Sequence, residues 1–163
     1  MKRLPDDMGL WTCPKCGRKL VSRNLWHSCT DATVESFLAG HGPRARALFD
    51  RFEQLVAQCG PYFVSPAKTR VTFMGRVRFA GITRINHRAI TCNFALPHPL
   101  KSPRFIKVEE VVPGWFVHHL RVADPAQLDN EVLGWLRDSY RLMGMQERLH
   151  RGPAPGNTRR GGK

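Results

Sequence analysis

Four metal-ligating side chains near the start of this 163-residue chain have the spacing of a single tetrahedral zinc site. A Cys-x-x-Cys pair is followed by a His-x-Cys pair, and the four residues are Cys13, Cys16, His27 and Cys29. The two thiolates of a Cys-x-x-Cys pair reach one ion across a tight turn, and Gly17 suits the left-handed backbone that such a turn favours. Four protein ligands leave no position for water, so we expect a structural Zn²⁺ in a zinc-ribbon-like module.

Two alternatives to zinc stay open for these cysteines, a redox pair and free thiols beside an unrelated histidine. A redox Cys-x-x-Cys follows a strand and opens a helix. This pair instead lies in a short polar segment whose basic residues, Lys15, Arg18 and Lys19, offset the formal charge of about −1 of Zn²⁺ with three thiolates. We expect the other two cysteines, Cys59 and Cys92, to be reduced core residues, and a disulfide between them is the alternative.

The distribution of charge favours an anionic partner. Lysine and arginine number 26 against 13 acidic residues, which gives a formal net charge of +13. The segment 54–108 contains no aspartate or glutamate. Such a field attracts nucleic acid, a phosphorylated ligand or an acidic protein, although a basic surface without any function remains an alternative.

The chain divides into four predicted parts. Residues 1–10 are expected to be flexible, 11–30 to form the zinc module, 31–146 to form one α+β domain, and 147–163 to be a disordered basic tail. No run of about 18 apolar residues and no apolar leader segment occur, so we expect a cytoplasmic protein without a membrane partner.

Hydrophobic periodicity predicts three helices around a set of strands. Helical spacing occurs in 34–39 after Thr33, in 43–59, and in a C-terminal segment with a capping-box pattern at Asp124 and Gln127.

The period then changes to two in five predicted strands, which are 68–73, 76–82, 90–96, 105–111 and 115–122. Short connections between these strands predict an antiparallel β-meander packed by the N- and C-terminal helices.

One turn decides whether basic residues gather on the sheet. With a tight turn at Met74 and Gly75, strand alternation places the flanking basic residues on one face and apolar residues such as Phe79 on the other, against Tyr140. The side chains proposed to bind an anion or nucleic acid are Lys68, Arg70, Arg76, Arg78, Arg104 and His118. A solvated face in which arginine stems cover apolar surface is the alternative.

Catalytic signatures are missing from the sequence. His118 and His119 point to opposite faces of a strand, with His118 on the more buried side, and a backbone-bonded core histidine is commoner than a functional one. Glu109 and Glu110 also point apart, which weakens a Mg²⁺ site. No phosphate-binding glycine loop or nucleophile elbow occurs, so we name no catalytic residue.

Several motifs together resemble a known family. They are Trp11-Thr-Cys-Pro-Lys-Cys-Gly-Arg, Trp26-His-Ser-Cys, Ser65-Pro-Ala-Lys-Thr-Arg-Val-Thr-Phe, Arg76-Val-Arg-Phe-Ala-Gly, Ser102-Pro-Arg-Phe and Phe116-Val-His-His-Leu-Arg. Over residues 11–145 the chain resembles the domain of unknown function 5655 proteins. The resemblance implies a zinc-ribbon-like head on a compact domain of bacterial cytoplasmic proteins, and it implies no established reaction.

We therefore expect a zinc-binding module that associates with nucleic acid or another anion through a basic sheet face. The alternative is a small-ligand domain, or an enzyme of unrecognised type, with a pocket around Lys68, Arg78 and His118. DNA and RNA are equally compatible with the sequence.

Overall fold

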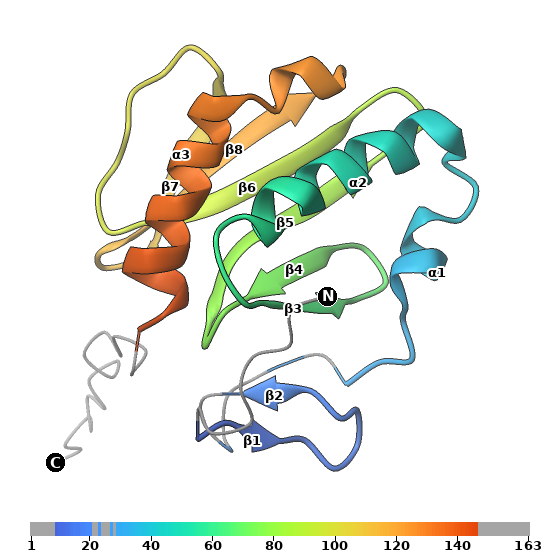
Figure 1. Cartoon of the computed structure of the whole chain (residues 1–163), viewed down its shortest axis with the longest axis vertical. Coiled ribbons are helices and arrows are strands. Elements are labelled where there is room, and N and C mark those ends of the chain that lie inside the picture. Colours follow the sequence, from blue (N-terminus) through green and yellow to red (C-terminus); the bar gives the residue numbers. More distant parts are fainter. Residues whose placement is uncertain (1–8, 21–22, 24–26, 28, 147–163) are drawn as a thin grey trace, which may run out of the picture.

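The computed structural model describes residues 9–20, 23, 27 and 29–146. It forms two layers, in which a six-stranded antiparallel sheet carries the main helices on one face and a small hairpin lies near one end (Figure 1). The predicted tail at 147–163 and most of the predicted flexible N-terminus lie outside the described residues. No described helix is long and apolar enough to cross a membrane.

The sheet has the strand order β3-β4-β5-β6-β8-β7, and every neighbouring pair is antiparallel. Its strands are β3 (Phe63–Pro66), β4 (Val71–Met74), β5 (Arg78–Ile85), β6 (Ile90–Leu96), β7 (Phe105–Val112) and β8 (Trp115–Val122). The first four follow one another as a meander, whereas β8 inserts between β6 and β7. The predicted α+β class with mixed helices and an antiparallel sheet is confirmed.

The helices begin where local capping favours them. Thr33 caps α1 (Val34–Leu38) through a capping box with Ser36, and α2 (Gly42–Ala57) has a proline in its first turn. The capping box at Asp124 opens a short 3₁₀ turn, Pro125–Gln127, rather than the long helix predicted there. A second cap at Asp129 begins α3 (Asn130–Ser139), which continues as a π-helical turn, Tyr140–Gly144.

The core lies between the helices and one face of the sheet. Its largest fully buried side chains are Phe49, Phe52, Phe73, Phe79, Phe94, Leu48, Leu55, Ile82, Ile90, Leu96 and Leu128. Phe79 meets Tyr140 edge to face with ring centroids 5.1 Å apart, as alternation predicts. Cys92 is fully buried in this core.

The beginning of the sheet differs from the prediction. Strand β3 was not predicted, and residues 67–70 form the turn into β4, so Lys68 lies in a turn and not on a strand. Arg76 also lies in a turn, where its backbone N–H donates to the carbonyl of Gly144 at 2.7 Å. The predicted row of four basic side chains along two paired strands is therefore wrong, because β4 starts only at Val71 and a register shift follows Phe73.

Candidate metal centre and the adjoining cleft

A two-stranded hairpin presents the first two cysteines. Strand β1 (Trp11–Thr12) pairs with β2 (Lys19–Leu20), and the Cys-x-x-Cys turn lies between them. The backbone N–H of Gly17 donates to the carbonyl of Cys13 at 2.8 Å, and Gly17 has the predicted left-handed conformation with φ +70°. The cysteine pair therefore opens an antiparallel strand, not the helix that a redox motif requires.

The four predicted ligands converge on one point. The ligand atoms of Cys13, Cys16, His27 and Cys29 all lie within 4.8 Å of one another, the only such group in the part of the chain that the structure describes. The Sγ atoms of Cys13 and Cys29 are 3.7 Å apart, and Nε2 of His27 is 3.1 Å from Sγ of Cys29. Tetrahedral zinc with Zn–S bonds of about 2.3 Å places two sulfurs about 3.8 Å apart. The donor set and its spacing fit a divalent metal.

Two of the clustered thiols, Cys13 and Cys29, have pKa values shifted in opposite directions. Burial opposes ionisation of Cys13, but hydrogen bonds from the backbone N–H groups of Cys16 and Lys15 and from the side chains of His27 and Cys16 together outweigh it and lower the pKa of Cys13 to about 6. Burial raises the pKa of Cys29 to about 11, and the hydrogen bonds that its S–H donates to the sulfurs of Cys13 and Cys16, together with the negative charge of those two groups, act in the same direction. A bound dication removes that repulsion, because it replaces the protons that the close sulfurs otherwise share.

The hairpin is attached to the main domain next to a cleft. The guanidinium of Arg18 donates to the carbonyl of Pro66 at the end of β3. Arg18, Leu20 and His27 line one side of a cleft of about 490 Å³, and the rest of its lining comes from the sheet. That side of the sheet faces away from α2 and α3 and is called the open face below (Figure 1).

Two cations, the carboxylate of Glu109 and several neutral polar groups line the sheet side of this cleft. Thr72, Gly81, Asn93 and His119 lie opposite one another across neighbouring strands, and each of them lines the cleft. Arg70 and Arg78 join them, and both residues keep part of their surface exposed to solvent. Desolvation of the Arg78 guanidinium against the cleft wall lowers its pKa, and the positive charge of Arg70 lowers it further.

A histidine that was not among the proposed contact residues contributes to the same cleft. Nε2 of His119 lies 3.0 Å from Oε1 of Glu109, whose other oxygen pairs with Lys107. These contacts from Lys107 and His119 outweigh desolvation and lower the pKa of Glu109. Strand alternation had placed the His119 side chain on the face opposite the core, and this was the one signal in the sequence that pointed to a position in the cleft. The pairing with Glu109 required the strand order.

Of the proposed contact residues, Arg70 and Arg78 meet in the cleft and the others do not line it. Lys68 is exposed in the β3–β4 turn, and Arg76 is half-buried in the β4–β5 turn. Arg104 binds within the domain, with contacts to Asp129 at 3.1 Å and Glu131 at 2.6 Å, and it stacks over the Trp135 ring at 5.5 Å. Its carboxylate partners lie far along the sequence, so local pattern did not reveal them.

His118 belongs to the core rather than to a pocket. It is fully buried, its ring stacks on Phe94 at 4.9 Å, and its Nε2 accepts a 2.9 Å hydrogen bond from the backbone N–H of Leu100. Burial lowers the pKa of His118. The nearby backbone carbonyls of Phe94 and Phe116 act in the opposite direction but do not offset the effect of burial. The alternative pocket around Lys68, Arg78 and His118 is not formed, because His118 points to the helix side and Arg78 lines the open face.

The main domain coincides with the region of the sequence that a family model matches. No curated protein and no solved structure matches the chain. The family model described as Domain of unknown function (DUF5655) matches residues 34–143, which begin at α1 and end within the π-helical turn. The four candidate metal ligands precede this region. Since the match spans well over half of the sequence, the chain belongs to the DUF5655 family.

Proposed function

We propose that the chain holds one structural Zn²⁺ at its N-terminal hairpin and binds a phosphate-bearing ligand, a nucleic-acid strand, in the open-face cleft. The observation that carries the second part is the proximity of Arg70 and Arg78. Neither guanidinium has a carboxylate partner among the described residues, and the positive charge of Arg70 adds to the cost of keeping Arg78 charged. A bound phosphate relieves this repulsion and accepts hydrogen bonds from both arginines.

The proposed zinc shapes one wall of the cleft. His27 is both a candidate ligand and a lining residue, and Arg18 lies in the same hairpin. A module this small has no core of its own, so four metal bonds supply the free energy that orders it. No coordination position remains for a substrate, and the metal therefore acts on binding only through the shape of the module.

The size and charge of the cleft suit a nucleotide unit. A volume of about 490 Å³ lies within the range of small-molecule sites, and Thr72 and Asn93 provide neutral hydrogen-bonding groups on its floor. The formal net charge of +13 favours a polyanion over a single free nucleotide, because phosphates outside the cleft then meet further lysines and arginines. Contacts to phosphate alone carry little sequence preference.

The test is fluorescence anisotropy with a labelled single-stranded oligonucleotide at about 50 mM salt, repeated over a salt series. The double variant Arg70→Ser/Arg78→Ser should bind more weakly, and its log–log salt slope should be shallower by about 1.4, which corresponds to two lost phosphate contacts on a single strand. The matched control, Lys68→Ser/Arg88→Ser, removes the same charge from exposed turns outside the cleft and should retain most of the affinity.

Other outcomes discriminate between ligand classes. A mononucleotide that binds as tightly as the oligonucleotide, with a weak dependence on salt, would favour the small-ligand alternative. Equal losses in the two double variants would mean that overall charge, and not the cleft, attracts the nucleic acid. No binding of oligonucleotide or duplex at low salt would refute the proposal.

A further inference from the structure

The edge strand β7 carries an unusual concentration of exposed apolar surface. Ile106, Val108, Val111 and Val112 are the large hydrophobic residues that remain exposed in the described part of the chain, and all four belong to this strand. Strand β7 pairs with β8 on one side and, among the described residues, with nothing on the other. Its outer backbone groups therefore offer hydrogen bonds to a further strand.

The regular part of β7 is short and bounded at both ends. Register shifts between Phe105 and Lys107 and between Glu110 and Val112 leave Ile106 and Val111 without partners on β8. Bulges of this kind limit pairing at a sheet edge. An added strand thus has four consecutive residues available, Lys107 to Glu110, which alternate between the two faces of the sheet.

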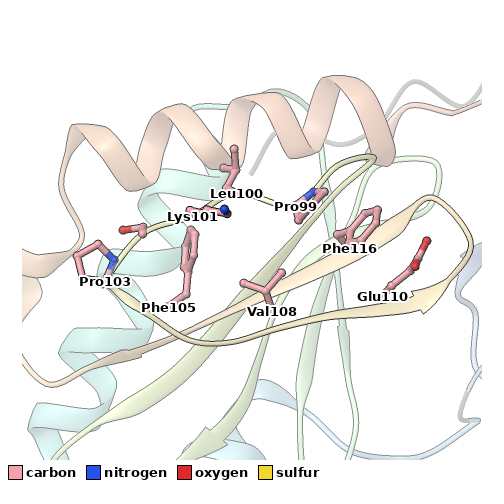
Figure 2. Close-up of a pocket in the computed structure, with 9 residues that line it drawn as sticks. Pro99, Leu100, Lys101, Pro103, Phe105, Val108, Glu110 and Phe116 are labelled. Carbon is pink, nitrogen blue, oxygen red and sulfur yellow. The ribbon is translucent and has the colours of Figure 1, made fainter.

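The hollow beside this stretch, on the helix side of the sheet, is mostly apolar, with Lys101, Ser102 and Glu110 as its polar members. Phe105, Val108 and Phe116 line a hollow of about 710 Å³ together with Pro99 and Leu100, and Glu110 of β7 lines it as well. Figure 2 shows how these side chains lie around it. Lys107 and Glu109 lie on the opposite, open face, where their partners on β8 are His119 and Val117. A strand added to β7 therefore places one of its side chains beside apolar surface on the helix side.

We propose that β7 pairs antiparallel with β7 of a second copy of this chain, around a two-fold axis at Val108. In an antiparallel pair, two residues that lie directly opposite each other have their side chains on the same face of the sheet. Successive residues of one strand alternate between faces, so the two-fold axis must pass through a residue and not between two residues. An axis at Val108 sets Val108 against Val108 of the second copy and each Lys107 opposite Glu109 of the other copy.

The competing registers oppose like charges. An axis at Glu109 sets two carboxylates directly opposite each other, and an axis at Lys107 does the same with two ammonium groups. The strand as a whole contains Lys107, Glu109 and Glu110 and is therefore slightly acidic, whereas the chain carries +13. Two copies meet through this edge without opposing positive charge, and the contact closes on itself as a dimer.

Sedimentation velocity over a concentration series tests the proposal. The unmodified chain should show a reversible monomer–dimer equilibrium, and Val108→Lys should raise its dissociation constant more than about tenfold, since two ammonium groups then meet at the axis. Lys107→Glu should also weaken the dimer, and the double variant Lys107→Glu/Glu109→Lys should restore it, because the opposite charges are then exchanged. Val112→Lys changes an exposed residue beyond the bulge and should leave the equilibrium unchanged.

Three outcomes would overturn self-pairing. One is a chain that stays monomeric up to about 1 mM, the weak limit of a specific contact. Another is a dimer that Val108→Lys and Lys107→Glu both leave intact, which would place the contact elsewhere. The third is a monomer whose amides at 107–110 become protected from hydrogen exchange only when an unrelated extended peptide is added, because the edge would then accept a different partner.

Discussion

The hydroxyl of Ser139 donates a 2.7 Å hydrogen bond to the backbone carbonyl of Phe79. The same Oγ accepts from the backbone N–H of Ala95 at 3.2 Å. Continuation of the β5–β6 register beyond Ala80 and Phe94 would set Phe79 opposite Ala95, where the two backbone groups would bond directly. The buried hydroxyl of Ser139, at the end of α3, therefore bridges β5 and β6 at a point where the two strands do not bond to each other directly.

Ser139→Ala should lower the free energy of unfolding by about 1–3 kcal/mol, because it leaves a buried carbonyl and a buried N–H without partners. Urea denaturation measures the loss. Thr69→Ala removes a hydroxyl from an exposed turn and should change stability by less than about 0.5 kcal/mol. An unchanged Ser139→Ala variant would mean that the two strands close up and bond directly.

Replacement of Arg104 should also destabilise the domain. Its guanidinium joins the loop before β7 to Asp129 and Glu131 at the start of α3 and also donates to the carbonyl of Gln127. Arg104→Met should cost about 1–2 kcal/mol, which is limited by the partial exposure of the group. The matched control is Arg141→Met, which breaks an exposed ion pair with Asp138 and should cost under about 0.5 kcal/mol.

The contact between Arg104 and Asp129 also makes the stability of the domain depend on pH in the acid range. Burial alone would raise the pKa of Asp129. Hydrogen bonds from the Val132 N–H and from Arg104 outweigh this effect and lower the pKa below its ordinary value. The stability that this carboxylate contributes is present above its unfolded pKa and is lost as the pH falls through the lower folded pKa. Arg104→Met should flatten the acid side of the stability curve, and a curve parallel to that of the parent would contradict this role.

A second pH dependence should come from His118. Its folded pKa is lowered by burial, so below the unfolded value of about 6.5 the unfolded chain binds a proton that the folded core excludes. Unfolding free energy should therefore fall as the pH is lowered through 6.5 and level off below the folded pKa. His118→Gln should reduce this slope, since the amide does not titrate, while His87→Gln in an exposed turn should keep it. Equal slopes in all three proteins would exclude His118 as the cause.

Metal removal should separate the hairpin from the domain. We expect one zinc per purified chain by elemental analysis, a ratio well below one in Cys29→Ala, and full occupancy in Cys59→Ala, whose thiol lies at the end of α2. A chelator should disorder the hairpin while the sheet retains a cooperative unfolding transition, because the main core lies between the sheet and the helices. Full zinc occupancy in Cys29→Ala would refute the ligand set.

Local sequence determined the features that depend on near neighbours. The Cys-x-x-Cys turn with Gly17 and the cap at Thr33 were predicted because their hydrogen bonds close within a few residues. Alternation also separated buried His118 from His119, since a strand turns successive side chains to opposite faces. The Asp124 capping box was read correctly, but only the structure revealed that the helix starts again at Asp129.

Only the tertiary structure decided which distant residues meet. Arg104 was assigned to ligand binding because its carboxylate partners lie on another element, whereas Arg78 kept its place in the cleft beside Arg70. The insertion of β8 between β6 and β7 brought Glu109 to His119 and left β7 at the edge. Spacing along the chain determines turns, caps and side-chain direction, because these depend on backbone geometry within a few residues. Strand order and ion pairing depend on how whole elements pack, and no local pattern encodes that packing.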